Sequence, residues 1–368
     1  MSANQSYPSH GGNLTWARKY YKKEELIDFS ANINPLGCSN FIYQSITANL
    51  SLIEQYPDPE CTSLKKELSL FYGVDEESIV VGNGASELLY LLCKAISPSK
   101  ALTLAPSFSE YLKAAKACGA SVEELVLHET NDFQLELPIL KRRIAQYDLI
   151  FLCNPNNPVG NIYTRELIKD IADLCYEHKT YLLVDESFLD FVKNKARFSV
   201  LLEIKTNPYL IVLSSLTKFF ALPGLRIGCC FGNKELIKKV KEIKDPWNVN
   251  CFAQLAGLVS LQDKDFQARS IEFITKEKER LYQELTKIPL LKVFYPSVNF
   301  ILVKILTENM TSTKLTRLLA EKGVLVRNCN TFNGLGEKFI RVAVRTREEN
   351  NLLIKNLEKI ILSGGKSD

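Results

Sequence analysis

The sequence lacks the patterns that mark metal sites, disulfide scaffolds and membrane spans. Its ten cysteines include no CxxC pair, and most of them lie within apolar runs, so neither a zinc site nor a disulfide framework is expected. Of only three histidines, His128 and His178 stand among charged residues with no partner motif. No apolar stretch is long enough to cross a bilayer. These absences predict buried thiols in a reducing compartment.

An excess of charge of one sign is also missing. The chain has 46 Lys and Arg against 42 Asp and Glu, a formal net charge of +4 over 368 residues. Basic stretches such as residues 234–244 alternate with apolar residues at helical spacing, which is typical of a solvated helix face. We therefore expect neither nucleic acid nor a membrane as a partner. The first 14 residues are polar and lack the apolar core of a signal peptide, which predicts a cytoplasmic protein.

The sequence does contain a regular alternation of strand and helix patterns from about residue 60 onward. Apolar strands closed by polar or Gly/Pro residues are predicted within residues 78–84, 100–107, 121–127, 147–158, 180–187 and 208–218. Helical patterns lie between most of them. This order predicts an α/β fold with a mostly parallel central sheet that is sandwiched by helices.

The pattern changes after about residue 265, where a long charged helix leads into shorter strands. This change predicts a smaller α+β C-terminal domain over residues 266–368. Residues 46–265 are then the large domain. Residues 1–45, rich in Gly, Asn, Pro and Ser, form an N-terminal arm that we expect to pack with the small domain.

Polar segments close the predicted strands, and their joint occurrence is the strongest chemical signal in the chain. They read GNGAS at residues 82–86, PSF at 106–108, NPNNP at 154–158, DESF at 185–188 and SLTK at 215–218. Each alone is ordinary turn or capping chemistry. Ligands of open α/β sheets bind outside the carboxyl ends of the strands, so we expect these segments to meet at one site.

The first of these segments predicts a phosphate site rather than a dinucleotide site. The dinucleotide fingerprint fails because Glu87 stands where its third glycine belongs, and no GK[ST] follows for a triphosphate loop. A helix that opens with Ala85 and Ser86 still offers free N–H groups to a phosphate. The same phosphate cradle is expected to include Ser215, Thr217 and Arg226.

The remaining segments supply partners for an aromatic aldehyde that carries this phosphate. Asp185 is a fixed negative charge for a ring nitrogen, Asn157 can donate to a phenolate oxygen, and Phe108 can stack on a flat ring. Lys218 lies in an apolar, cation-rich setting that should lower its pKa, which suits a Schiff base with an aldehyde. Phosphate, pyridinium, phenolate and aldehyde together describe pyridoxal 5′-phosphate (PLP).

With these motifs the sequence resembles the fold-type I PLP enzymes, the aminotransferase class I and II family, over essentially its whole length. The resemblance rests on the ordered set GNGASE, PSFSEY, NPNNPVG, VDESF and SSLTKFFALPGLRIG. It implies a PLP-dependent transferase-like large domain, Lys218 as the catalytic lysine, and Gly84 and Phe188 in the cofactor pocket. It also implies a homodimer with shared sites, in which Tyr56 reaches the cofactor phosphate of the neighbouring subunit.

Two branches of this family compete, and the motifs favour the threonine-phosphate decarboxylases over the histidinol-phosphate aminotransferases. SHGGN at residues 9–13 and DFSANINPLG at residues 28–37 are similar to the decarboxylase arm. Phe188 stands where the aminotransferases usually have a tyrosine, and Arg327 and Arg341 stand as in the decarboxylases. This likeness implies decarboxylation of L-threonine O-3-phosphate to (R)-1-amino-2-propanol O-2-phosphate in cobalamin biosynthesis. Histidinol-phosphate aminotransferase or a related aminotransferase is the alternative, and a non-catalytic PLP-binding regulator is a remote one.

The predicted substrate carries a carboxylate and a phosphate, which both favour planar cationic donors. We expect Arg341, at the end of a small-domain strand, to bind the carboxylate. The phosphate is assigned to Arg327, His10 and the Gly11 N–H. Two asparagines are expected to contact the amino acid, Asn32 and Asn157. Residue types do not decide between decarboxylation and transamination, because that choice depends on which Cα bond stands perpendicular to the cofactor ring.

Overall fold

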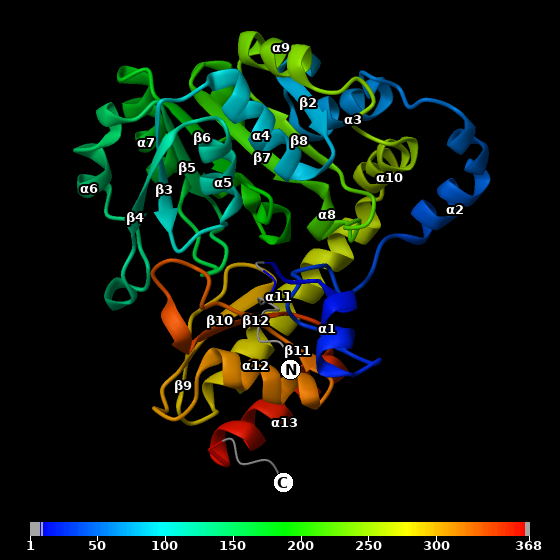
Figure 1. Ribbon diagram of the computed structural model, residues 1–368. Helices are drawn as coiled ribbons and strands as arrows, with labels where there is room; N and C mark the ends of the chain where they lie inside the picture. Colours follow the sequence, from blue (N-terminus) through cyan, green and yellow to red (C-terminus); the bar gives the residue numbers. More distant parts are fainter. Residues whose placement is uncertain (1–7, 9, 365–368) are drawn as a thin grey trace.

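The computed structural model describes Pro8 and residues 10–364, and its larger layer is a seven-stranded sheet (Figure 1). The strand order is β2-β8-β7-β6-β5-β3-β4. The strands are β2 (Ile79–Gly82), β3 (Lys100–Ala105), β4 (Ser121–Val126), β5 (Leu149–Cys153), β6 (Tyr181–Asp185), β7 (Leu210–Ser215) and β8 (Gly228–Phe231). All neighbours run parallel except β8, which is antiparallel to both β2 and β7. The predicted α/β fold is thereby confirmed, with β8 as a strand that the sequence reading missed.

Helices cover both faces of this sheet. Successive side chains of its strands point to opposite faces, and because both sets are apolar, both faces need cover from water. Val80, Leu183 and Ile211 pack on one face with α4 (Gly84–Ile96), α5 (Glu110–Ala117) and α9 (Lys234–Ile243). The opposite face is covered by α3 (Thr62–Tyr72), α6 (Leu137–Lys141), α7 (Arg165–Glu177) and α10 (Cys251–Gln262). No helix among the described residues is long and apolar enough to cross a membrane.

The second layer is a four-stranded antiparallel sheet, which lies below the large sheet in Figure 1. Its order is β12-β13-β10-β9, built from β9 (Leu291–Val293), β10 (Phe300–Ile305), β12 (Arg327–Asn328) and β13 (Phe339–Ala343). The helices of this region are α11 (Lys264–Thr286), α12 (Ser312–Glu321) and α13 (Arg347–Leu362). This layer is the smaller α+β part that the sequence predicts.

The N-terminal segment joins the smaller layer through main-chain pairing. Strand β1 (Ile27–Asp28) runs parallel to β11 (Val324–Leu325), and α1 (Leu14–Tyr21) lies beside it (Figure 1). Helix α2 (Asn40–Ala48) then leads back toward the large sheet and packs against α10. The predicted division at residues 45 and 265 stays a prediction, and residues 1–7, 9 and 365–368 lie outside the described part.

The topology brings the polar strand ends to one edge of the large sheet. Strands β5, β6 and β7 are parallel, so their last residues Cys153, Asp185 and Ser215 lie at the same edge. Gly228 opens β8 there, opposite both Gly82 and Ser215. This edge faces the small sheet and the arm, and the space between them holds the candidate site.

Candidate active site

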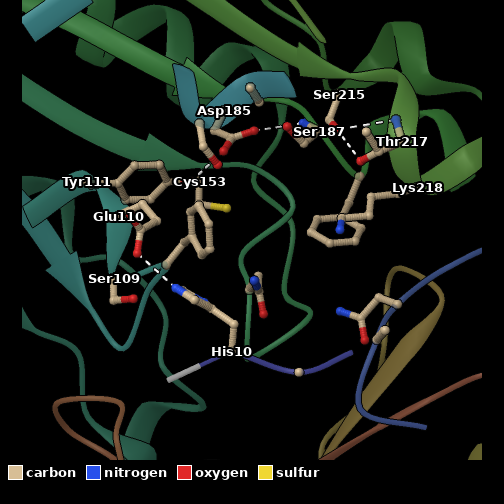
Figure 2. Close-up of a pocket in the computed structure, with 18 of the residues that line it drawn as sticks. His10, Ser109, Glu110, Tyr111, Cys153, Asp185, Ser187, Ser215, Thr217 and Lys218 are labelled. Atoms are coloured by element: carbon tan, nitrogen blue, oxygen red, sulfur yellow. Dashed lines mark hydrogen bonds and ion pairs between the residues drawn. The ribbon is translucent and has the colours of Figure 1, made fainter. Parts of the chain in front are cut away.

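A cavity of about 610 Å³ lies between the carboxyl edge of the large sheet, the small sheet and the arm. Every cofactor and substrate residue that the sequence predicts lines it, except Gly84 and Tyr56. Figure 2 shows Asp185 and Lys218 on opposite sides of this space, with His10 below them. Residues far apart in the sequence therefore converge on a single site.

Lys218 is placed by the short helix α8 (Leu216–Phe219), which follows β7 directly and is capped by the Ser215 side chain. Burial and the nearby guanidinium groups of Arg226 and Arg341 lower the pKa of Lys218 to about 8, while Asp185 acts in the opposite direction. An amine with this pKa is neutral more often at neutral pH than an ordinary lysine, and only the neutral form attacks an aldehyde.

Asp185 is the last residue of β6; it lines the cavity and is 5% exposed. Its carboxylate accepts hydrogen bonds from the Tyr111 hydroxyl at 2.6 Å and from the Ser187 backbone N–H at 2.9 Å. Burial raises the pKa of Asp185, whereas these hydrogen bonds and Lys218 oppose that rise. A protonated ring nitrogen would supply the positive charge that this buried carboxylate favours.

A phosphate cradle lies at the N-terminus of α4. Ala85 and Ser86, in the first turn of this 13-residue helix, line the cavity, and the Asn83 side chain does not cap the helix. Ser215 Oγ and Thr217 Oγ1 lie 2.7 Å apart and also line the cavity. The helix dipole and the hydroxyl groups together suit a phosphate.

Gly84 does not line the cavity, but it allows Arg226 to reach the cradle. Its φ is +79°, and a Cβ there would lie 2.4 Å from Arg226 Nη2. Gly228 is equally constrained, because its Cβ would lie 2.6 Å from the Ala85 nitrogen. A guanidinium close to a helix N-terminus favours an anion between or beside them, so the residues present fit the phosphate of PLP.

Two arginines of the small sheet face the other end of the cavity. Arg327 and Arg341 stand directly opposite each other on β12 and β13 and are 6% and 5% exposed. Arg341 therefore lies in the middle of its strand, and the predicted position at a strand end is wrong. Because Ile340 and Val342 point into the core, the alternation of the strand turns Arg341 toward the cavity.

The hydrogen bonds that these arginines make with described residues go to uncharged oxygens. Arg341 donates to Asn157 Oδ1 and, at 2.7 Å, to the Ser30 carbonyl, and it makes no salt bridge within the described residues. Arg327 donates to the Pro8 carbonyl at 3.0 Å and to Thr331 Oγ1 at 2.8 Å. Burial lowers the pKa of both groups, that of Arg341 to about 10. Like charges directly opposite each other destabilise a sheet, so this pair favours an anionic ligand.

The arm completes the wall of the cavity with His10, Gly11 and Asn32. Gly11 passes so close to the Ser30 carbonyl oxygen that a Cβ would lie 2.1 Å from it. Asn32 is buried, and its Oδ1 has no hydrogen-bond partner in the described part of the chain. Phe188 is 6% exposed and packs edge-on against Phe300. An unpartnered buried amide oxygen in a cavity that arginines also line is typical of a site built for a polar ligand.

The structure adds cavity residues that the sequence reading did not assign. Glu110, Tyr111 and Lys113 lie on α5, and Phe332 packs against the Arg327 guanidinium at 5.2 Å. The PSFSEY motif already contains Glu110 and Tyr111, but its spacing alone does not show which residues point inward. Among the described residues, no cluster of His, Cys, Asp or Glu could hold a metal ion.

Tyr56 lies outside the cavity of its own chain. It is 79% exposed and stacks on Trp247 with ring centroids 4.5 Å apart. The predicted contact of Tyr56 with a neighbouring subunit is not represented in a single chain and stays a prediction.

Comparisons with known proteins agree with this geometry. A family model described as aminotransferase class I and II matches residues 24–357. The threonine-phosphate decarboxylase of Salmonella typhimurium is 34% identical over 363 residues, 98% of each chain. The adenosylcobalamin biosynthesis bifunctional protein CobDQ of Leptospira interrogans is 36% identical over 360 residues, which are 96% of this chain and 41% of that protein. The solved histidinol-phosphate aminotransferase of Clostridium acetobutylicum is 33% identical with a TM-score of 0.86, covering 92% of this chain and 100% of that one.

Proposed function

The chain belongs to the aminotransferase class I and II family, and from this premise we propose that it is a PLP-dependent decarboxylase of L-threonine O-3-phosphate. The reaction consumes a proton and yields carbon dioxide and (R)-1-amino-2-propanol O-2-phosphate. Full-length similarity to a threonine-phosphate decarboxylase supports this assignment, and similarity to a bifunctional cobalamin-biosynthesis protein supports a place in that process.

The observation that carries the proposal is the buried pair Arg327 and Arg341 at the end of the cavity away from the phosphate cradle. Two anionic groups on one substrate, a carboxylate and a phosphate, would neutralise both guanidinium groups. Arg341 is fixed by Asn157 and Ser30 and would bind the carboxylate. Arg327 lies on the side of His10 and the arm and would bind the phosphate, together with the Gly11 N–H.

The cofactor would be held by residues from several strand ends. Its phosphate would contact Ala85, Ser86, Ser215, Thr217 and Arg226, and Asp185 would pair with its ring nitrogen. When bound, PLP accepts the electron pair that a broken Cα bond leaves behind. The chain's own contribution is to hold each charge in place before the reaction begins.

Asn157 connects the cofactor end of the cavity to the carboxylate end. Its amide oxygen accepts a hydrogen bond from Arg341, which leaves the amide nitrogen to donate to the phenolate oxygen of the cofactor. Phe108 and Phe188 would lie against the cofactor ring, and Asn32 beside the amino acid. Lys218 would bind the cofactor aldehyde and, once the substrate amine replaces it, return a proton to the substrate Cα.

A histidinol-phosphate aminotransferase is the second candidate, because one such enzyme is similar in sequence and in structure. Histidinol phosphate carries no carboxylate. In that reaction only the second substrate, an amino acid such as glutamate, would need Arg341. The decarboxylase uses both arginines for one molecule, which fits the paired burial better.

Single-turnover assays distinguish the two reactions. We expect the holoenzyme to release one carbon dioxide per site from L-threonine O-3-phosphate and to keep its cofactor as the aldehyde. With glutamate or histidinol phosphate, no pyridoxamine phosphate should accumulate. Carbon dioxide measured by a coupled assay and cofactor absorbance report both outcomes. Absence of carbon dioxide together with formation of pyridoxamine phosphate would assign the aminotransferase.

We further propose a homodimer in which Tyr56 completes the phosphate cradle of the partner. Tyr56 stacks on the 47% exposed Trp247, and the segment before it carries two further exposed apolar side chains, Phe41 at 59% and Ile53 at 74%. Exposed large apolar side chains of this kind are typical of an interface. A second copy is the partner that would bring Tyr56 to a cradle that contains no tyrosine of its own.

Replacing Tyr56 with phenylalanine tests this arrangement. Loss of a hydrogen bond to a charged group should raise the dissociation constant for PLP by about 10- to 100-fold. The dimer, measured by sedimentation, should persist because the aromatic ring remains. Tyr43→Phe, at another exposed tyrosine of this surface, is the matched control. A monomeric protein, or unchanged PLP affinity in Tyr56→Phe, would contradict the shared site.

A further inference from the structure

At the mouth of the cavity, His10 of the arm contacts Glu110 of the large-sheet layer. His10 Nε2 lies 2.9 Å from Glu110 Oε1 of α5, and the dashed line in Figure 2 marks this contact. On the opposite side, Arg327 of the small sheet donates to the Pro8 carbonyl of the arm, and within the arm the Gly12 N–H donates to Ser30 Oγ. The position of the imidazole ring over the cavity therefore depends on Glu110 and on the Phe108 ring, whose centroid lies 5.7 Å from that of the imidazole.

The Glu110 carboxylate is itself held firmly. Lys113 donates to Oε1 at 2.7 Å, the Tyr90 hydroxyl donates to Oε2 at 3.3 Å, and the side chain is only 14% exposed. Burial opposes its ionisation, but the hydrogen bonds from Lys113 and His10 outweigh burial and keep the pKa of Glu110 below its ordinary value. An ionised carboxylate thus lies in the same cavity as the cations Lys113 and Arg327.

The charged groups that face His10 are Glu110, Lys113 and Arg327. Burial and the two cations lower the pKa of His10, and Glu110 opposes them without cancelling them. This shift favours the neutral ring, and because an ionised carboxylate only accepts hydrogen bonds, the contact with Glu110 favours the proton on Nε2. Its second nitrogen, Nδ1, makes no hydrogen bond within the described residues, so in this state it presents a lone pair rather than a donor.

We propose that Glu110 is a positioning residue that fixes His10 by its Nε2–H and keeps the ring protonated once the substrate phosphate binds. This inference rests on the proposed function, in which His10 contacts that phosphate. A proton from solvent then adds to Nδ1, and the imidazolium donates one hydrogen bond to Glu110 and one to the phosphate. With a dianionic phosphate on one side and a carboxylate on the other, the charged ring is favoured over the neutral one.

The role of Glu110 explains why an acidic residue stands at a mouth built for an anion. A carboxylate would repel the phosphate if the two faced each other directly. With the imidazolium between them, each anion contacts a positive group. The arrangement also makes substrate binding dependent on pH, since affinity should fall as the pH rises through the pKa of His10 in the complex.

Calorimetry of the holoenzyme with (R)-1-amino-2-propanol O-2-phosphate tests the inference. This ligand keeps the phosphate but has no carboxylate to lose, and titrations at pH 7.5 in buffers of different ionisation enthalpy give the number of protons taken up. Wild-type enzyme should take up about 0.5 to 1 proton more than Glu110→Gln, because an opposite charge within a few ångströms favours protonation. The variant should bind about 10-fold more weakly, from loss of a charge-assisted hydrogen bond.

Two further variants separate positioning from a general structural effect. His10→Asn should lose the same proton uptake, and the double variant should bind no more weakly than His10→Asn alone. Glu124→Gln, at an exposed glutamate outside the cavity, should match the wild type in proton uptake and affinity. Equal proton uptake in wild type and Glu110→Gln overturns the inference. If the wild-type enzyme binds no phosphorylated ligand, the proposed function fails and this inference with it.

Discussion

Replacing Lys218 with alanine should lower kcat by at least about 10²- to 10⁴-fold, which is the contribution of a positioned acid–base group alone. The variant loses both the amine that binds the cofactor aldehyde and the group that returns a proton to Cα. The residual rate should not recover at higher pH. Carbon dioxide release at saturating substrate measures the effect, and the absorbance of the bound cofactor shows whether the covalent bond has formed.

Two variants show whether the loss comes from the chemistry of this lysine. Lys218→Arg keeps the positive charge, but a guanidinium does not lose its proton at neutral pH, so its kcat should fall as far. Lys278→Ala is the control. Burial also lowers the pKa of Lys278, but this lysine lies outside the cavity, so the variant should keep full activity. Full biological activity of Lys218→Ala would instead support a non-catalytic PLP-binding protein.

Much of the large sheet could be predicted from the sequence because its strands are short apolar runs closed by polar residues. Strand β8 could not be predicted in this way, because Gly228–Phe231 directly follows the segment that carries Lys218 and Arg226 and is not set off from it by polar residues. Its position depends on pairing with β2 and β7, which begin 149 and 18 residues earlier in the chain (228 − 79 and 228 − 210). Such long-range antiparallel pairing leaves no local pattern.

The candidate site likewise contains residues that the sequence could place and residues that it could not. Asp185, Asn157 and Ser215 follow strands directly, so parallel topology brings them together and the sequence could predict their convergence. Glu110, Tyr111 and Lys113 lie in the first turn of α5, after the loop that follows β3, and their contacts depend on how α5 packs against the sheet. The direct opposition of Arg327 and Arg341 likewise depends on the register of β12 and β13.

That register leads to the second prediction, Arg341→Gln, which should lower kcat/KM for L-threonine O-3-phosphate by about 10²-fold or more. Truncating one partner of a buried charge pair costs about 2–5 kcal/mol, and here the loss falls on the substrate carboxylate. Carbon dioxide release should fall further than binding of (R)-1-amino-2-propanol O-2-phosphate, which has no carboxylate. Steady-state kinetics and calorimetry on the same preparations measure both.

Arg345→Gln is the matched control, because Arg345 lies four residues further on, pairs with Glu349 and does not line the cavity. It should keep kcat/KM, whereas Arg341→Gln should keep the thermal stability of the ligand-free enzyme. The second expectation follows from the same geometry: removing one of two directly opposed guanidinium groups relieves a repulsion as it removes hydrogen bonds. An Arg341→Gln enzyme with unchanged kcat/KM would mean that another group holds the carboxylate, and the buried arginine pair would no longer support decarboxylation over transamination.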